Sequence, residues 1–401
     1  MGPNDSSFDA AVNNIRKILE EQVERVEKIS KPVEWLDYSK LERLVIGAIG
    51  GDGIGPIIAK ETTRILERLL ENEIRAGKVE IREIEGLTIE NRVKQMKALP
   101  DEVLAEIRKC HVLLKGPTTT PEEGSGMPNI ESANIAIRRV FDLFANVRPV
   151  RVPSEGIDWV FFRENTEGEY MLGSRGVMVT PDLALDFKII TRPGAERIIR
   201  LAFEHARKTE RKKVTVVTKA NVVKTTDGLF LETAKRVARD FPEIKWDGWY
   251  IDVFTAKLID PRRRREFEVV VLPNLYGDIV TDEAAELQGG VGTAGSANLG
   301  ARFGMFEAIH GSAPRMITEG RGAYADPLSL MRAAAMMLEH VGMMEQSRRL
   351  AKALDVCAMY ERKAVITGRP DGATAAQFGD DVIRALADPR LDARWQSYQK
   401  S

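Results

Sequence analysis

The chain has 401 residues, of which 43% are hydrophobic and 30% are charged, and its formal net charge is −1. This composition excludes a disordered chain and is ordinary for a globular enzyme with one large domain or two smaller ones. The balanced charge gives no overall attraction to nucleic acid or to an acidic membrane, and no run of 18 apolar residues predicts a membrane span.

The first predicted element is an amphipathic helix at residues 7–30. Apolar side chains recur there at steps of three or four, from Phe8 to Ile29, and charged side chains fill the other face. We expect residues 1–43 to form a helical extension that packs on the main body or on a partner subunit. We assign no chemistry to it.

A glycine-rich stretch, IGAIGGDGIGP at Ile46–Pro56, looks like the start of a dinucleotide-binding loop. The Rossmann fingerprint G-x-G-x-x-G needs a third glycine, which lets the helix pack closely on the strand. That position holds Pro56 in one reading frame and Ile58 in the other. The fingerprint therefore fails, and the lysine of a Walker phosphate-binding loop is also missing.

From Leu44 onward, short apolar runs alternate with longer amphipathic segments. WVFFREN, KVTVVTKAN and FEVVVLPN are typical runs, and GLFLETAKRVARDF is a typical amphipathic segment. This alternation predicts an α/β fold with a largely parallel sheet. Residues 168–192 lack a helical period and predict β arms, whereas the chain after Pro327 is mostly helical by pattern.

Three arginines, Arg138, Arg148 and Arg163, lie in otherwise apolar surroundings within SANIAIRRVFDLFANVRPV and FFRENTEGEY. A guanidinium group binds a carboxylate through two parallel hydrogen bonds, so three converging arginines would suit a polycarboxylate substrate. The alternative is that the three arginines are unrelated and pair with surface acids. The sequence leaves both interpretations open.

Two aspartates lie four residues apart in PNLYGDIVTDEAAEL, at Asp278 and Asp282. On a helix they would share one face, where two carboxylates repel each other unless a cation or a proton lies between them. Their hard oxygen atoms suit Mg²⁺ or Mn²⁺. The alternative is that Asp278 caps the helix and Asp282 is only solvated.

Two further stretches follow predicted strands. Lys219 comes after VTVVT, at the carboxyl end of a strand, where ligands bind in open α/β folds. Nearby cations would lower its pKa and make it a base, although a strand-end lysine more commonly extends to solvent. FEAIHGSAP at 306–314 has small residues that permit close backbone approach to a ligand, and a lone His310 is more typical of a structural histidine.

Together these stretches resemble the β-decarboxylating dehydrogenases, which include isocitrate, isopropylmalate, homoisocitrate and tartrate dehydrogenases. The motifs that carry the resemblance occur in one order, as GGDGIGP, KGPTTTP, SANIAIR with ANVRP, FRENTEGEY, VTKANVVKTTDGLF, PNLYGDIVTDEAAEL and FEAIHGSAP. The resemblance implies a two-domain α/β fold of the isocitrate/isopropylmalate dehydrogenase type and not a Rossmann fold. Its active site would lie in an interdomain cleft that a homodimer shares.

The resemblance also implies domain boundaries. A large α/β domain on the cofactor side would comprise residues 44–143 and 289–401. A small domain would comprise residues 144–288. A β arm near 168–195 would clasp a second subunit.

The same resemblance assigns roles in catalysis. Arg138, Arg148 and Arg163 would clamp the substrate carboxylates. Asp278 and Asp282 would bind Mg²⁺ or Mn²⁺ together with Asp252 from the other subunit. Lys219, also from the partner, would help to remove the hydroxyl proton while hydride passes to the nicotinamide, and Tyr170 would protonate the enolate after CO₂ is lost.

A nicotinamide cofactor would be held largely by the HGSAP loop and its neighbours. The implied contacts are Lys115, Thr119, Thr120, Asn221, His310, Gly311, Ser312, Ala313, Pro314, Arg315, Met316 and Asp326. Arg315 stands where NAD-dependent members commonly carry an acidic residue, and a cation suits the 2′-phosphate of NADP. The lysine–tyrosine pair usual for NADP is absent, and Asp326 replaces a frequent asparagine. We expect NAD or NADP, with a preference for NADP.

The expected substrate is isocitrate. Ser132 and Asn134 are polar. In the isocitrate branch of the family, a serine and an asparagine at these positions contact the γ-carboxylate of the substrate. The isopropyl group of isopropylmalate would leave both side chains unpaired. Homoisocitrate, tartrate and isopropylmalate are the alternatives. A non-catalytic regulatory subunit is a remote one, because the chain keeps its base, its proton donor and its metal carboxylates. With two widely separated cysteines and no signal-peptide pattern, we expect a cytoplasmic protein. The resemblance implies a homodimer, and the balanced charge leads us to expect no nucleic-acid or membrane partner.

Overall fold

The computed structural model describes residues 5–121, 124, 126–173 and 175–399. The chain divides into two compact units, each built from segments that are distant in sequence. The first unit combines Met1–Glu34 with Phe144–Ala284, and the second combines Trp35–Leu143 with Ala285–Ser401. The divisions thus fall after residues 34, 143 and 284, where we expected domain boundaries after 43, 143 and 288.

The first unit contains a run of hydrogen-bonded strands in the order β4-β5-β10-β8-β9. Their bounds are Ala145–Val152 for β4, Ile157–Glu164 for β5, Lys213–Thr218 for β8, Lys245–Tyr250 for β9 and Val269–Leu272 for β10. β4 and β5 are antiparallel, and the other neighbours are parallel. β10 reads VVVL and is buried throughout, as expected of a central strand with both faces covered.

The helices of the first unit follow these strands. They are α7 (Arg192–Lys208), α8 (Thr226–Val237), α9 (Ile251–Leu258) and α10 (Asn274–Gln288), with 3₁₀ turns at Pro153–Glu155, Ala238–Asp240 and Arg264–Glu266. α7 packs on β5, β8 and β10. It begins where the Thr191 hydroxyl accepts a hydrogen bond from the Gly194 backbone N–H, which satisfies one free donor of the first turn.

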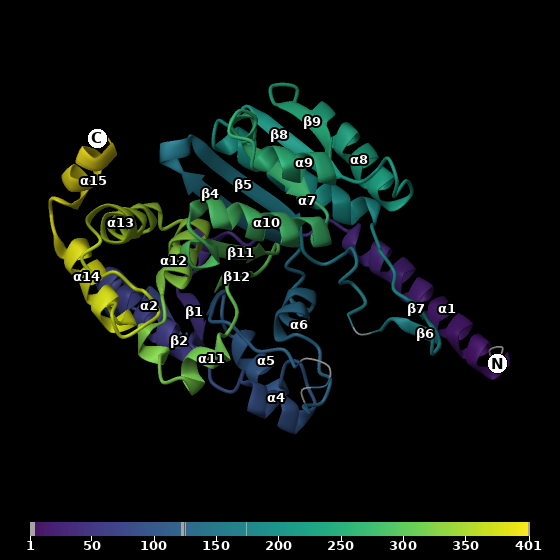
Figure 1. The fold of residues 1–401 in the computed structure, drawn as a ribbon, viewed down its shortest axis with the longest axis horizontal. Coiled ribbons are helices and arrows are strands. Elements are labelled where there is room, and N and C mark those ends of the chain that lie inside the picture. The colour runs from purple at the N-terminus through teal and green to yellow at the C-terminus, as the bar shows by residue number, and fades with distance from the viewer. Residues whose placement is uncertain (1–4, 122–123, 125, 174, 400–401) are drawn as a thin grey trace. The chain divides into compact units, whose positions relative to one another are not determined.

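An N-terminal helix also belongs to the first unit. α1 (Asp5–Ile29) lies beside a hairpin of β6 (Val177–Thr180) and β7 (Leu183–Leu185), as Figure 1 shows. Ala11 and Ile15 of α1 pack with Val177, Val179 and Phe187. The helix expected at residues 7–30 is thus α1, and the hairpin lies within the segment for which we expected β arms.

The second unit contains strands in the order β2-β1-β3-β12-β11. Their bounds are Leu44–Ile49 for β1, Val79–Glu83 for β2, Val112–Lys115 for β3, Gly295–Leu299 for β11 and Gly304–Ala308 for β12. Only β11 and β12 among these neighbours pair antiparallel. The largely parallel sheet predicted from the alternating pattern is present in both units.

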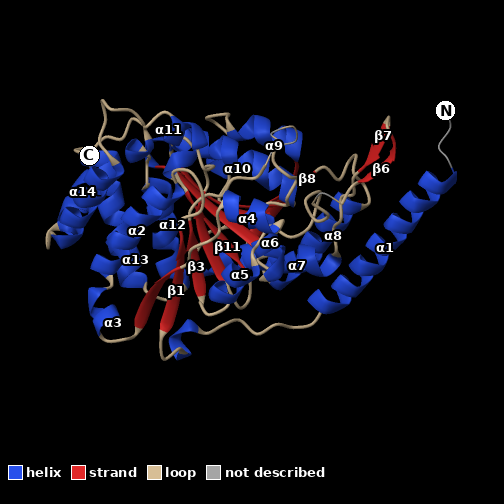
Figure 2. Ribbon diagram, turned by 90° about the horizontal axis from the view of Figure 1, so that it is seen from below, coloured by secondary structure: helices blue, strands red, loops and turns tan. Residues whose placement is uncertain are grey.

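The helices of the second unit cover this sheet. They are α2 (Gly55–Leu69), α3 (Glu71–Arg75), α4 (Ile89–Gln95), α5 (Asp101–Ile107), α6 (Ala133–Val140), α11 (Pro314–Thr318), α12 (Leu328–His340), α13 (Met344–Asp355), α14 (Ala375–Ala387) and α15 (Leu391–Gln399). Short 3₁₀ turns lie at Tyr38–Lys40, Val291–Thr293 and Gly322–Tyr324, and a π-helical turn at Val356–Glu361. α2 packs on β1, and α12 packs on β11 and β12 (Figure 2). No helix of the described residues is both long and apolar enough to cross a membrane.

Candidate active site

Two aspartates lie one turn apart on α10 of the first unit. The Tyr170 hydroxyl donates to Asp278 Oδ2 at 2.9 Å, and Arg163 Nη1 donates to Asp278 Oδ1. Arg148 Nη1 donates to Asp282 Oδ1 at 2.8 Å. The helix and its shared carboxylate face are therefore present as the spacing predicted. Asp278 is the fifth residue of α10, so it does not cap the helix.

Strand register brings the two arginines together. In the antiparallel pair of β4 and β5, Arg148 lies opposite Phe161 and Asn146 lies opposite Arg163, so both guanidinium groups project from one face of the sheet. Both side chains are nearly buried, and a buried cation needs paired acceptors. α10 provides these acceptors. It passes so close to Arg163 that a Cβ added at Gly277 would lie 2.5 Å from Arg163 Cγ.

A side chain that the sequence did not single out completes the Arg163 site. Asn274, the first residue of α10, accepts hydrogen bonds from Arg163 Nε at 3.0 Å and from Arg163 Nη2 at 2.7 Å. The register pairs Arg163 with Leu272 at the end of β10, which places the start of α10 beside the guanidinium group. Arg163 is thus fixed between an amide and the Asp278 carboxylate.

Tyr170 is held as a proton donor. Burial and the neighbouring Asp278 carboxylate raise the pKa of Tyr170 to about 12, and the hydrogen bond to that carboxylate adds to the effect. The phenol therefore remains protonated at neutral pH. Its position against a carboxylate at one end of α10 suits a general acid.

Lys219 and Asp252 follow the ends of neighbouring parallel strands. The register pairs Thr218 of β8 with Tyr250 of β9, and Lys219 Nζ donates to Asp252 Oδ1 at 2.6 Å. This hydrogen bond lowers the pKa of Asp252. The side chain that contacts the Lys219 amine is thus a carboxylate that follows the neighbouring strand.

One chain by itself brings few of the predicted metal ligands together. Across the described residues, no group of three or more His, Cys, Asp and Glu side chains is arranged to hold a metal ion. Asp252 is paired with Lys219, and the α10 carboxylates are paired with arginine and tyrosine. The structure thus brings together Asp278 and Asp282 but does not group them with Asp252 of the same chain.

The third predicted arginine belongs to the second unit. Arg138 Nη2 on α6 donates to Glu307 at 3.1 Å, and Asn298 Nδ2 donates to the same Glu307 oxygen at 2.8 Å. Lys115 Nζ lies 3.5 Å from the other Glu307 oxygen. Burial alone would raise the pKa of Glu307, but the two cations outweigh it and hold the pKa at about 2. Arg138 Nε is buried and has no hydrogen-bond partner among the described residues.

Lys115, one of the predicted cofactor contacts, lies beneath the surface. Its side chain is completely buried, its Nζ donates to the Gly116 carbonyl at 2.9 Å, and burial lowers its pKa. Glu307 was quoted within FEAIHGSAP but given no role. A charged residue in an otherwise apolar strand must find a buried partner, and that signal would have identified it.

Ser132 and Asn134 lie at the start of α6. Asn134 Oδ1 accepts a hydrogen bond from the Thr118 hydroxyl at 3.3 Å. Asn134 and Arg138 are four residues apart, so they share one face of α6. Both Ser132 and Asn134 are half-buried, which leaves part of each side chain accessible to a ligand.

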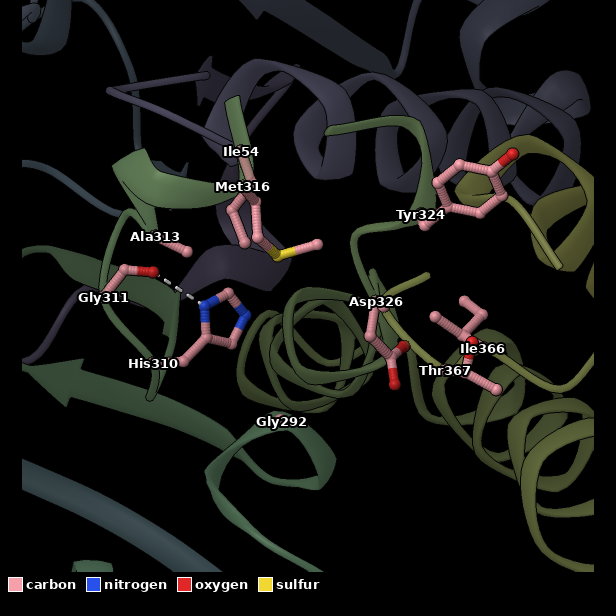
Figure 3. Close-up of a pocket in the computed structure, with 11 residues that line it drawn as sticks. Ile54, Gly292, His310, Gly311, Ala313, Met316, Tyr324, Asp326, Ile366 and Thr367 are labelled. Carbon is pink, nitrogen blue, oxygen red and sulfur yellow. Dashed lines mark hydrogen bonds between the residues drawn. The ribbon is translucent and has the colours of Figure 1, made fainter. Parts of the chain in front are cut away.

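A cavity of about 510 Å³ lies next to the HGSAP loop. Five of the predicted cofactor contacts line it, namely His310, Gly311, Ala313, Met316 and Asp326. Figure 3 shows His310 and Asp326 around this hollow, with His310 Nδ1 3.0 Å from the Gly311 carbonyl oxygen. His310 Nε2 is buried without a partner in the described part of the chain, and burial raises the pKa of Asp326.

Sequence reasoning missed six of the eleven residues that line the cavity. The residues that it missed are Ile54, Gly292, Tyr324, Ile366, Thr367 and Gly368. The stretch 366–368 carries no motif, and only the fold brings it to the HGSAP loop.

The other predicted cofactor contacts are not among the described residues that line this cavity. Ser312 is within 2.7 Å of the Thr119 hydroxyl, while Thr120, Pro314 and Arg315 are exposed and do not line the described wall. Asn221 belongs to the first unit.

The glycine-rich loop after β1 supports the HGSAP loop. A Cβ at Gly53 would lie 2.0 Å from the Ser312 carbonyl oxygen, and one at Gly51 would lie 2.2 Å from the Pro117 carbonyl oxygen. The buried Asp52 carboxylate accepts from the backbone N–H of Thr119 at 2.7 Å. These glycines therefore permit close packing between loops, which explains a glycine cluster without a Rossmann fingerprint.

Residues 45–382 match the family model for isocitrate/isopropylmalate dehydrogenase. The chain belongs to the isocitrate/isopropylmalate dehydrogenase family. This confirms the resemblance carried by the seven motifs, and with it the α/β fold of this family. Membership also confirms that the protein is an enzyme, a dehydrogenase of this type.

Three curated relatives show the range of this family. The mitochondrial NAD isocitrate dehydrogenase subunit 2 of Schizosaccharomyces pombe is 39% identical over 76% of this chain and 78% of its own. The homoisocitrate dehydrogenase of Methanocaldococcus jannaschii is 35% identical over 84% of this chain and 96% of its own. The NADP isocitrate dehydrogenase of Rickettsia prowazekii is 38% identical over 73% of this chain and 58% of its own.

A solved structure agrees with the family fold. The isocitrate dehydrogenase of Methylococcus capsulatus superposes with a TM-score of 0.75 at 34% identity, and covers 86% of this chain and 100% of its own. The relatives of this chain therefore include isocitrate and homoisocitrate dehydrogenases. Both NAD and NADP occur in the names of the isocitrate dehydrogenases.

Proposed function

We propose that the protein catalyses the oxidative decarboxylation of isocitrate to 2-oxoglutarate and CO₂, with Mg²⁺ or Mn²⁺ and with reduction of NADP or NAD. The observation that carries the proposal is the α10 site, where Asp278 meets both Arg163 and Tyr170 while Asp282 meets Arg148. Two carboxylates that would bind the metal, two arginines that would bind substrate carboxylates and a phenol that would donate a proton lie together there. This reaction needs all three.

The donor chemistry of α10 suits a divalent cation. Asp278 and Asp282 offer hard carboxylate oxygens from one helix face, which Mg²⁺ and Mn²⁺ prefer. Asp252 of the partner subunit would complete the set. The metal would supply Lewis acidity that stabilises the enolate formed when CO₂ leaves.

Exposed apolar side chains beside the site residues support a shared dimeric site. Val222 is 67% exposed near Lys219, Val253 is 43% exposed next to Asp252, and Ile279 is 60% exposed next to Asp278. Burial of these side chains against a second copy would favour association through the hydrophobic effect. A second copy that covered them would bring its own Lys219 and Asp252 to α10.

The arginines would bind substrate carboxylates. Arg148 and Arg163 are nearly buried and project from one strand face, and their guanidinium groups would turn to the substrate carboxylates once their bonds to Asp282 and Asp278 open. Arg138 carries an unpartnered buried Nε. Ser132 and Asn134 near it are polar, which favours a third carboxylate over an isopropyl group. The homoisocitrate dehydrogenase relative makes homoisocitrate the second candidate.

Two residues would move protons. Lys219 would take the hydroxyl proton after its ion pair with Asp252 opens. Tyr170 would then deliver a proton to the enolate carbon, because its raised pKa keeps the phenol protonated.

The HGSAP cavity, lined by the residues given above, would hold the nicotinamide cofactor. Its unpartnered buried His310 Nε2 is a hydrogen-bonding atom that a ligand could satisfy, and its size suits part of a dinucleotide. The preference for NADP rests on Arg315, whose side chain is 85% exposed and pairs with Glu319.

An activity panel tests the proposal. Purified full-length protein is assayed with Mn²⁺, with NADP or NAD, and with isocitrate, homoisocitrate, tartrate or 3-isopropylmalate. We expect kcat/KM for isocitrate to exceed that for isopropylmalate by about 100-fold, because unpaired polar groups penalise the apolar substituent. Faster turnover of isopropylmalate would contradict the role given to Ser132 and Asn134. A higher kcat/KM with NAD would contradict the preference for NADP.

A further inference from the structure

The segment that joins Arg163 to Tyr170 is anchored by two buried glutamates. We call residues 164–170 the anchor segment. The Glu164 carboxylate accepts from the backbone N–H of Glu167 at 2.6 Å, and the Glu167 carboxylate accepts from the Thr191 backbone N–H at 2.9 Å. Both carboxylates are completely buried. The anchor segment is thus tied internally and to the start of α7.

Two buried carboxylates so close together require cations. Burial and the charge on Glu167 raise the pKa of Glu164 to about 7. Two cations meet this need. Arg197 of α7 acts against the raised pKa of Glu164, and its Nη2 donates to the Thr166 hydroxyl at 3.0 Å. Arg25 of α1 pairs with the other carboxylate, since its Nη1 donates to Glu167 Oε1 at 2.7 Å and its Nη2 donates to the Thr166 hydroxyl at 3.4 Å. The N-terminal helix therefore contributes a cation to the middle of the anchor segment.

From Glu167 the contacts lead directly to the α10 site. The Glu167 carbonyl accepts from Asn274 Nδ2 at 2.8 Å, and the Oδ1 of the same amide accepts from Arg163. Three residues later, Tyr170 donates to Asp278. A shift of Glu167 would therefore disturb both the arginine and the tyrosine at α10.

We propose that Arg25 is a positioning residue through which the N-terminal helix holds the Tyr170 hydroxyl in place for proton delivery. The proposal rests on the proposed function, in which Tyr170 is the proton donor. The family model begins at residue 45, so α1 lies outside the region that carries the family match. In this chain, turnover would then depend on a helix outside the matched region.

The first test does not depend on activity. Amide hydrogen–deuterium exchange is measured on the full-length wild type and on Arg25→Met, Arg25→Lys and Glu21→Gln. Glu21→Gln is the matched control, because it removes an exposed α1 ion pair with Arg175 at 2.6 Å and leaves Glu167 untouched. In Arg25→Met we expect the amides of residues 166–168 to exchange roughly tenfold faster, because the segment opens locally more often.

The second test separates the chemical steps. For Arg25→Met we expect kcat to fall about tenfold while the KM for isocitrate stays within about twofold, because substrate-binding groups are unchanged. Single-turnover hydride transfer should stay close to the wild-type rate. Deuterium incorporation from D₂O beside the carbonyl of added 2-oxoglutarate should fall with kcat, since it reports proton exchange at the enolate carbon.

Arg25→Lys keeps a cation at Glu167 and protects the test against a variant that fails to fold. It should restore part of kcat, because an ammonium group pairs with the carboxylate without the forked geometry.

The proposal is overturned if Arg25→Met matches Glu21→Gln in exchange and in kcat. It is also overturned if exchange rises while kcat stays constant. If the wild type turns over none of the panel substrates, the proposed function fails, and the exchange result alone shows whether Arg25 holds the segment.

Discussion

In the proposed reaction, proton delivery depends on the phenol of Tyr170. Tyr170→Phe keeps the ring and removes the hydroxyl that donates to Asp278. We expect kcat to fall by about 100-fold or more, the usual effect of losing a general acid, with little change in the KM for isocitrate. Steady-state kinetics with isocitrate measures both quantities.

Tyr276→Phe is a suitable control, because Tyr276 also lies near the site but its hydroxyl bonds to Lys188. An equal loss of kcat in the two variants would show that a general disturbance of this region, and not the Tyr170 proton, explains the effect.

At the scale of elements, substitutions in the loop after β1 show whether its close packing shapes the cavity beside the HGSAP loop. Gly53 has φ +57°, and an added Cβ would clash with the Ser312 carbonyl. Gly77 has φ +70°, but an added Cβ would meet nothing within 4 Å. Gly77→Ala should therefore cost only the left-handed backbone strain, about 1–2 kcal/mol.

Gly53→Ala adds a steric clash to that strain. We expect it to lose about 1–3 kcal/mol more than Gly77→Ala in free energy of unfolding, and to raise the KM for the cofactor, because Ile54 lines the cavity. Urea denaturation and cofactor titration measure the two effects. Equal losses in the two variants would rule out a role for the loop contact.

The elements that could be predicted are those whose contacts are local. Asp278 and Asp282 share a face because any helix brings together residues four apart, and the motifs placed Lys219 at a strand end. Asn274 and Glu307 were missed because their arginine partners lie 111 and 169 residues away in the chain. Strand order determines such pairs, and periodicity carries no information about it.

The same limit applies to α1. Its amphipathic pattern predicted a helix, but nothing in the pattern distinguished Arg25 from the other charged residues of the helix. Its partner Glu167 lies 142 residues further along the chain. The contact between Lys219 and Asp252 could not be predicted for a related reason, since only the β8–β9 register brings the two side chains together.

For the whole molecule, the pH dependence of stability includes a contribution from His205. Burial lowers its pKa to about 4, and nearby arginine and lysine add to this shift. The folded protein then binds fewer protons at this site than the unfolded chain, in which the pKa is near 6.5. The stabilisation is therefore present above about pH 6.5 and is lost as the pH falls toward 4.

His205→Gln removes this titration. Between pH 7 and pH 5, we expect the free energy of unfolding to fall by about 2 kcal/mol less in the variant than in the wild type. Urea denaturation at both pH values measures the difference. The raised pKa of Glu164 acts in the opposite direction, but it is common to both proteins and cancels. Identical pH slopes would show that His205 is not desolvated in the folded protein.

Each unit is assembled from segments that leave the ribosome at very different times. β3 ends at Lys115, while its neighbour β12 ends at Ala308. At ordinary translation speeds, the open edge of β3 must wait roughly ten to forty seconds for that neighbour. An unpaired edge invites pairing with another chain, so newly made copies should depend on chaperone protection until synthesis is nearly finished.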